Sequence, residues 1–149
     1  MNRKWTDRKL KDRKKEGIAM AGSVLTGNES LIMEEFWKSG EPLTSVDLME
    51  RLQEKKWHAS YLVGALRKLE EKGFIRICGT VRHSTQYARQ FTAAVSREEF
   101  AAQLALTSGI GEKSIAEVTL AMVRGLSTDP EEIDSILNEA SEELKKRRN

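Results

Sequence analysis

The chain has 149 residues, of which 39% are hydrophobic and 32% charged, so we expect one ordinary domain or two small ones with a modest core. No apolar run approaches the roughly 18 residues of a membrane span. The charged N-terminus lacks the apolar centre of a signal peptide, and we therefore expect a cytoplasmic protein. A single cysteine, Cys78, excludes an intramolecular disulfide and argues against a cysteine-based metal site.

The net charge of +2 hides a strong asymmetry along the chain. Residues 1–26 carry a balance of +5 and residues 27–92 a balance of +1, whereas residues 93–144 carry −8 and the last five residues +4. Basic ends around an acidic body are compatible with a nucleic-acid partner. Charge alone, however, indicates attraction to phosphates and not the reading of a base sequence.

Residues 1–24 are typical of a basic, flexible N-terminal arm. Trp5, Leu10 and Ile18 are too few large apolar residues for a core of their own. The segment RKLKDRKKE within this arm is suited to a helix or a transient contact against DNA phosphates.

Two short helices are expected next. Thr26 and Glu29 have the spacing of a capping box at the start of the first, and Gly40 ends it. Thr44 or Ser45 caps the second. The apolar positions are Ile32, Met33, Phe36 and Trp37 in the first helix, and Val46, Leu48, Met49 and Leu52 in the second.

A third helix is expected over residues 60–73, after Trp57. Leu62, Leu66 and Leu69 recur at helical spacing and form one apolar stripe, and Gly73 stops the helix. The opposite side carries Ser60, Tyr61, Gly64, Arg67, Lys68 and Glu71.

The period then changes to that of a β-hairpin. Residues 74–77 suggest a strand, residues 79–84 a polar turn, and residues 85–89 a returning strand. A short helix that leads into a basic hairpin, late in a small helical unit, is typical of a winged helix-turn-helix. In that arrangement the second helix of the pair enters the DNA major groove.

Several motifs follow one another in a fairly specific order. They are Leu25-Thr26-x-x-Glu29, Met33-x-x-x-Trp37, Trp57, Leu69-x-x-Lys72-Gly73 and, later, Val95-Ser-Arg-Glu-Glu-Phe100. This order resembles the penicillinase-repressor family, the BlaI/MecI/CopY group of winged-helix regulators, over roughly residues 25–145. The resemblance implies operator binding by the third helix and a dimerisation region that begins near residue 95.

The chain departs from that family at the recognition helix. The family's helix offers a Thr-x-Lys-Thr arrangement, and the matching positions here are Tyr61, Val63 and Gly64. The operator of the relatives is therefore not expected to carry over. The copper-responsive branch needs clustered cysteines, and the penicillinase branch is induced by cleavage at an Asn-Phe bond. Neither feature occurs in this sequence.

We expect DNA contacts from the third helix and from the residues around it. Arg67 and Lys68 suit phosphate or guanine, and Tyr61 can donate a hydrogen bond or stack. His83 is read as a surface turn residue and not as a metal ligand or pH switch. The expected DNA-binding residues are Ser45, Ser60, Tyr61, Arg67, Lys68 and Arg82.

Residues 93–149 predict a helical dimerisation region with a basic C-terminal end. Ser96 caps a first helix, a second runs over residues 112–124 with Gly125 as its stop, and Asp129 caps a third. Short amphipathic helices of this kind need a partner, which favours a homodimer over a monomer whose helices fold back. The apolar positions expected in the interface are Phe100, Leu104, Ile115, Val118, Met122, Ile133, Ile136, Leu137 and Leu144.

One competing motif lies in this half. The segment LTSGIGEK, residues 106–113, resembles a helix-hairpin-helix that presents backbone N–H groups to a phosphate. The acidic surroundings favour an ordinary turn between helices.

The sequence therefore predicts a mainly α fold with a small β wing: an arm over 1–24, a winged-helix domain over 25–92, and a dimerisation region over 93–149. We expect a dimeric repressor on a palindromic operator, with no cofactor. The alternative is a protein-interaction module that docks another protein through its acidic 93–144 region. An enzyme is not expected, because the two histidines, His58 and His83, lie in separate elements and no nucleophile–base pair is recognisable.

Overall fold

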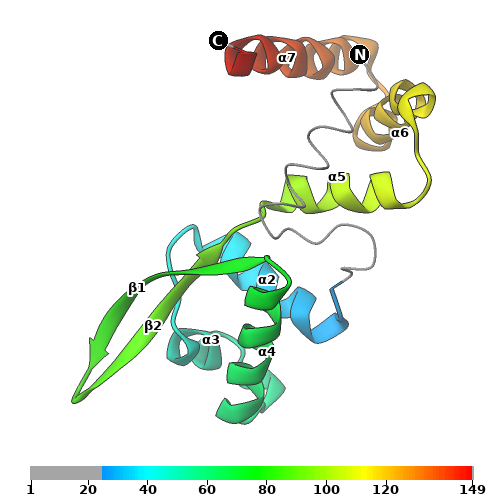
Figure 1. Cartoon of the computed structure of the whole chain (residues 1–149). Coiled ribbons are helices and arrows are strands. Elements are labelled where there is room, and N and C mark those ends of the chain that lie inside the picture. Colours follow the sequence, from blue (N-terminus) through cyan, green and yellow to red (C-terminus); the bar gives the residue numbers. More distant parts are fainter. Residues whose placement is uncertain (1–24, 149) are drawn as a thin grey trace. The chain divides into compact units, whose positions relative to one another are not determined.

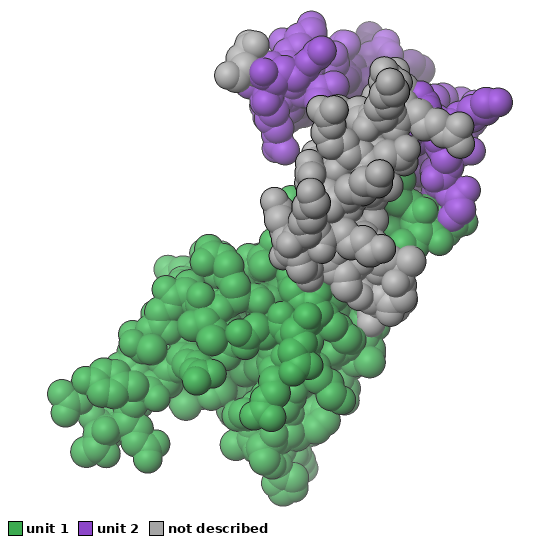
Figure 2. Space-filling model, viewed as in Figure 1, with its two compact units in different colours: residues 1–108 green, residues 109–149 purple. Residues whose placement is uncertain are grey.

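The structure is a computed structural model that describes residues 25–148 (Figure 1). The chain forms two compact units, residues 1–108 and residues 109–149 (Figure 2). The basic arm expected over residues 1–24 lies outside the described residues.

Three helices open the first unit: α2 (Gly27–Ser39), α3 (Ser45–Arg51) and α4 (Ala59–Glu71). The expected capping box of α2 is confirmed, because the Thr26 side chain accepts the Glu29 amide and Glu29 accepts the Thr26 amide. Thr44 makes the same reciprocal arrangement with Asp47 at the start of α3. These caps satisfy backbone N–H groups that a helix start leaves unpaired.

Helix α4 ends in a Schellman motif. The amide of Phe74 donates to the carbonyl of Leu69, and the amide of Gly73 donates to Glu70. The motif requires a left-handed residue, and Gly73 supplies it with φ of 83°. The chain therefore turns sharply from α4 into the first strand, as the position of this glycine predicts.

The hairpin is longer than the sequence suggested. Strand β1 (Ile75–His83) pairs with β2 (Gln86–Ala93) in antiparallel register, so the expected turn over residues 79–84 is wrong. A register shift between Ile77 and Gly79 absorbs one residue and lets the pairing continue. Only Ser84 and Thr85 separate the strands, and Ser84 is left-handed with φ of 58°.

Leu43, between α2 and α3, forms an isolated antiparallel β-bridge with strand β2 of this hairpin. Its amide and carbonyl exchange hydrogen bonds of 2.9 and 2.8 Å with Phe91 of β2. Three helices beside a hairpin with this extra bridge form a winged helix, and the predicted fold class of a mainly helical chain with a β wing is confirmed.

The core of this unit joins the apolar faces of α2, α3 and α4 to the base of the hairpin. Trp37 and Trp57 are partly buried and pack against it. Val46 is an exception, because its side chain is 52% exposed although its apolar character predicts an inward position on the second helix. The core residues are Leu25, Ile32, Met33, Phe36, Leu43, Leu48, Leu52, Leu62, Ala65, Leu66, Leu69, Phe74, Ile75, Phe91 and Val95.

Helix α5 (Arg97–Thr107) starts on this core and is capped by Ser96, as predicted. The ring of Phe100 lies 5.9 Å from that of Trp37 and 5.6 Å from that of Phe74. The Trp37 indole N–H donates to the carbonyl of Val95 at 2.9 Å. Phe100, expected in a dimer interface, packs against the core of the first unit through these two rings.

The second unit contains a 3-10 turn (Glu112–Ser114), α6 (Ile115–Leu126) and α7 (Pro130–Arg148). Gly125 does not end α6 as predicted, since one glycine costs a helix only about 1 kcal/mol. The helix stops instead where Ser127 becomes extended.

Two carboxylates, those of Asp129 and Glu132, form hydrogen bonds at the start of α7. Asp129 accepts the amide of Glu131, which caps the helix as expected. The carboxylate of Glu132, however, accepts the hydroxyl of Ser127.

Two further observations concern single features of the chain. Cys78 is exposed on β1. Among the helices of residues 25–148, none is both long enough and apolar enough to span a membrane.

Candidate nucleic-acid interface

Helix α4 turns its leucine stripe inward and leaves a polar and small-residue face outside. Leu62, Leu66 and Leu69 are buried, as the period predicted. Ser60, Arg67 and Lys68 are exposed. Since residues three and four apart share a helix face, residues 60, 63, 64, 67 and 68 lie together on the outer surface of α4.

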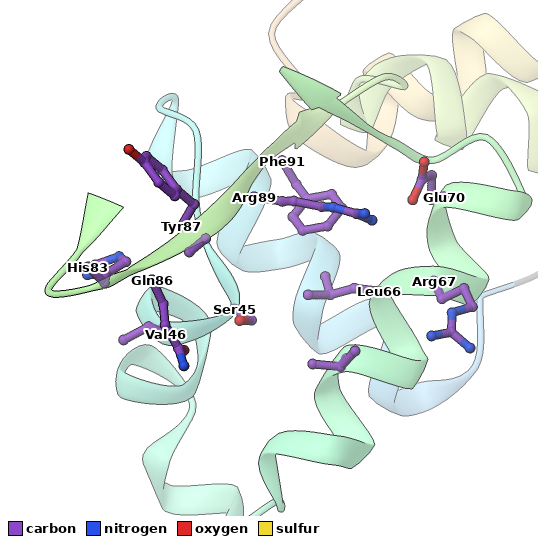
Figure 3. A pocket seen from close by; sticks show the side chains of 12 residues that line it. Ser45, Val46, Leu66, Arg67, Glu70, His83, Gln86, Tyr87, Arg89 and Phe91 are labelled. Carbon is purple, nitrogen blue, oxygen red and sulfur yellow. The ribbon is translucent and has the colours of Figure 1, made fainter. Parts of the chain in front are cut away.

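A groove of about 450 Å³ separates one side of α4 from the wing, and we call it the wing groove. Figure 3 shows Arg89 reaching from β2 toward the side of α4 that carries Arg67 and Glu70, while Gln86 points toward Val46. In Figure 2 the surface of the first unit is hollowed between the wing and the helices. The lining residues are Ser45, Val46, Val63, Leu66, Arg67, Glu70, His83, Gln86, Tyr87, Ala88, Arg89 and Phe91.

A second groove, of about 760 Å³, lies on the other side of α4 beside the start of α2, and we call it the α2 groove. Ser60, Tyr61 and Lys68 line it, together with Asn28 and Lys72. The expected DNA-binding residues are thus divided between two sides of one helix. Ser45 and Arg67 face the wing, and the other three residues of α4 face α2.

Tyr61 is tied to its own chain. Its hydroxyl accepts a hydrogen bond of 2.7 Å from the side-chain amide Nδ2 of Asn28, and its ring centroid lies 5.2 Å from that of Trp57. The side chain remains 44% exposed, so part of the ring is free for another contact. These contacts fix the first turn of α4 against α2 and against the turn that precedes α4.

Three cations of this surface have no carboxylate partner among the described residues. Within residues 25–148, Arg67, Lys68 and Arg89 form no ion pair. By contrast, Arg51 pairs with Glu35, and Arg97 pairs with Glu34. An exposed cation without a carboxylate partner is available to a phosphate.

Arg82 lies near the tip of the wing, opposite Tyr87 in the strand register. Its Nε donates to the carbonyl of Ser84 at 3.0 Å, which uses one of its donors and holds the guanidinium over the turn. The remaining donors are exposed to solvent. Arg82 therefore extends the row of unpaired cations from α4 onto the wing.

Ser45 is held at the entrance of the wing groove by the cap of α3. The Asp47 carboxylate accepts both the amide and the hydroxyl of Thr44, at 2.8 and 2.9 Å. The Thr44 amide is the main reason that the pKa of Asp47 lies below its usual value, with His83 and Arg51 nearby adding to the shift. The capped turn fixes the backbone on which Ser45 and Val46 face the wing.

Metal chemistry has no geometric support in the part of the chain that the structure describes. No group of three or more His, Cys, Asp or Glu side chains lies close enough there to hold a metal ion.

Sequence reasoning missed four residues that line the two grooves. Arg89 lies two residues before the buried Phe91 on the returning strand, so the alternation along a strand places both residues on one face. Gln86 has the opposite parity and gave no such signal. Val46 is apolar, and this property alone predicts an inward position, which is wrong. Asn28 gave no signal, since its contact with Tyr61 joins residues 33 positions apart.

An exposed helix bearing unpaired cations, beside a hairpin wing and across from a capped α3, defines a winged-helix DNA-binding module. The model of the penicillinase repressor family matches residues 25–142. The chain belongs to this family, and it is a DNA-binding transcriptional repressor and not an enzyme.

Similar solved structures include a variant of ZitR from Lactococcus lactis, at 18% identity, with 95% of this chain and 93% of that chain covered and a TM-score of 0.37. The adhesin competence repressor AdcR from Streptococcus pyogenes shows 16% identity, coverage of 97% and 98%, and a TM-score of 0.36. At these TM-scores the likeness adds nothing to the family assignment. No curated protein matches the chain.

Proposed function

We propose that the chain represses transcription as a homodimer that occupies a palindromic operator. The single observation that carries the DNA-binding surface is the row of unpaired cations, Arg67, Lys68, Arg82 and Arg89, on α4 and the wing. A folded protein leaves many cations exposed. What favours phosphate here is that four cations without a carboxylate partner among residues 25–148 occupy two neighbouring elements, α4 and the wing.

In this proposal α4 enters the major groove and the wing follows the adjacent backbone. Ser60, Arg67 and Lys68 lie on the outer turns of α4, within reach of base edges and phosphates. Ser45 at the start of α3 and Arg82 on the wing contact the backbone on either side. Tyr61 has a different main role, because its contacts with Asn28 and Trp57 hold α4 in place.

Dimerisation is proposed from apolar side chains that the second unit leaves exposed. Met122 and Leu126 of α6 are 63% and 80% exposed, and Leu144 of α7 is 47% exposed. No residue of α7 is buried. A helix with apolar positions and no buried side chain is stabilised by a partner surface, and the same helices of a second copy would supply one.

Most of the apolar residues that the sequence places in the interface are not fully buried within the single chain. Ile115, Val118, Ile133 and Leu137 are half-buried, and Ile136 is 37% exposed. Leu104 of α5 is 40% exposed, whereas Phe100 packs on Trp37 and Phe74. We therefore leave Phe100 out of the interface and retain the other residues.

A two-fold dimer would present two copies of α4 to one face of the duplex. Half-sites about 10 base pairs apart, or a multiple of that, would match such a dimer. Occupancy of a promoter by the dimer would then block transcription.

The test is selection of bound fragments from random genomic DNA by the purified protein at about 150 mM salt, which suppresses non-specific binding. We expect a palindromic motif with half-sites about one helical turn apart. A folded protein that enriches no motif would refute the proposal.

A further inference from the structure

Two valines stand exposed on the surface proposed to face DNA. Val46 of α3 is 52% exposed and Val63 of α4 is 47% exposed, and both line the wing groove. Each belongs to a helix whose other large apolar residues are mostly inside, so neither is needed to complete the core. Single exposed valines are common in proteins, but two that line the same groove form an apolar patch within it.

Gly64, the neighbour of Val63, has no structural reason to be glycine. A Cβ at this position would meet nothing within 4 Å, and the residue does not adopt a left-handed conformation. Glycine in a helix interior costs about 1 kcal/mol relative to alanine. A smooth helix surface next to Val63 allows an outside group to approach the backbone closely.

The surroundings of this patch indicate what that outside group is. Arg67 follows Val63 by one helical turn, and Arg89 lies across the groove, and both guanidinium groups are without a carboxylate partner among residues 25–148. An apolar patch flanked by free cations suits duplex DNA better than an apolar protein partner. The apolar group that duplex DNA presents in its major groove is the C5-methyl of thymine.

We propose that Val46 and Val63 read thymine methyl groups in each half-site, with Gly64 allowing the close approach. This inference rests on the proposed function, since it assigns specificity to the same surface. Sequence preference would then come from apolar contact at the thymines, while Arg67 and Arg89 supply attraction to the backbone.

The test uses the operator recovered by genomic selection and replaces its thymines with uracil, one at a time. Uracil lacks only the methyl group and keeps every base-pair hydrogen bond. We expect binding to weaken about three- to fourfold at one or two thymines of each half-site, as for loss of one buried methyl. Uracil at flanking positions outside the motif is the matched control and should change nothing.

The variants Val63→Ala and Val46→Ala connect the effect to the two side chains. Because both side chains are exposed, the variants should fold, and circular dichroism and thermal unfolding check this. Each variant should bind the thymine operator more weakly than the wild type and lose the difference between thymine and uracil at its own position.

Three outcomes separate this inference from the function on which it rests. Recovery of no motif at all would refute the proposed function. A motif whose thymines can all be replaced by uracil without loss would overturn the valine assignment alone. A uracil effect that persists undiminished in both alanine variants would overturn it as well.

Discussion

The ammonium of Lys72 lies 2.7 Å from Oε1 of Glu29 and joins the C-terminal end of α4 to the first turn of α2. The same carboxylate oxygen accepts the Thr26 amide at 2.9 Å. Glu29 is 4% exposed, so its charge depends on these two donors. One buried carboxylate therefore both caps α2 and fixes the C-terminal end of α4.

Substituting Lys72→Met should lower the free energy of unfolding by about 1–3 kcal/mol, because the Glu29 carboxylate would lose a charged donor while buried. The control is Lys68→Met, one turn earlier on α4 at an exposed and unpaired position, where we expect a change within about 0.5 kcal/mol. Urea titration of both variants measures the difference. Equal effects would mean that the Lys72–Glu29 pair contributes nothing to stability.

The pair also predicts a dependence of stability on pH. Burial opposes ionisation of Glu29, but the donors of Lys72 and Thr26 outweigh it and lower the pKa of this carboxyl from its ordinary 4.5. A group whose folded pKa is depressed stabilises the protein above its unfolded pKa, and this stabilisation is lost as pH falls through the folded value.

Replacement Glu29→Gln should therefore reduce stability at neutral pH, and the gap to the wild type should narrow as the pH is lowered below 4.5. Unfolding free energies measured from neutral pH to about pH 3 test this. Glu71→Gln, at an exposed position on α4, is the control. A gap that stays constant with pH would show that Glu29 acts without its charge.

The start of α5 should behave as part of the DNA-binding unit. Phe100→Ala removes a ring in contact with Trp37 and Phe74 and should lower the free energy of unfolding of residues 25–108 by about 2–4 kcal/mol. Leu104→Ala, on the same helix but 40% exposed, should cost far less. Hydrogen exchange of the α2 and α4 amides distinguishes this loss of stability from an effect on dimerisation. Weaker dimerisation with unchanged protection of α2 and α4 would show that Phe100 belongs to the dimer interface.

The dimer proposal predicts sensitivity to polar substitution on α6. Met122→Ser and Leu126→Ser should each weaken dimerisation about tenfold or more, because each apolar side chain would be buried in both halves of a symmetric interface. Sedimentation equilibrium measures the dimer dissociation constant. Val46→Ser, also an exposed apolar position but in the other unit, should leave it unchanged. A protein that is monomeric at all accessible concentrations would contradict the proposal.

Local signals predicted most of the helices of the first unit. The Thr26–Glu29 cap, the leucine stripe of α4 and the left-handed Gly73 are each set by residues a few positions apart. The length of the hairpin was predicted wrongly. Residues 79–83, part of the polar stretch interpreted as a turn, belong to the strand, because the register shift between Ile77 and Gly79 lets the pairing continue. Strand length there depends on pairing across the sheet, which a local pattern does not contain.

The site was less predictable than the fold for a related reason. The sequence suggests that Tyr61 is free to contact DNA, but its hydroxyl accepts a hydrogen bond from the side-chain amide of Asn28, 33 positions away. The apolar character of Val46 predicts a core position, but the tertiary arrangement leaves this residue 52% exposed. Arg89 becomes part of the site only because β2 places it across the groove from α4. These facts depend on contacts between distant segments.

In the proposed complex, the cations of α4 and the wing contact DNA phosphates. This contact is tested most directly by measuring affinity for the selected operator against salt concentration for Arg67→Ala and Arg89→Ala. Lys38→Ala, which removes an exposed cation that lines neither groove, is the control.

We predict that each arginine variant binds about tenfold or more weakly and that its salt dependence becomes shallower. The log–log slope should decrease by about 0.9 for each phosphate that the variant no longer neutralises. Lys38→Ala should match the wild type in both affinity and slope. If the two arginine variants and the control all retain wild-type affinity and slope, α4 and the wing do not form the DNA-binding surface.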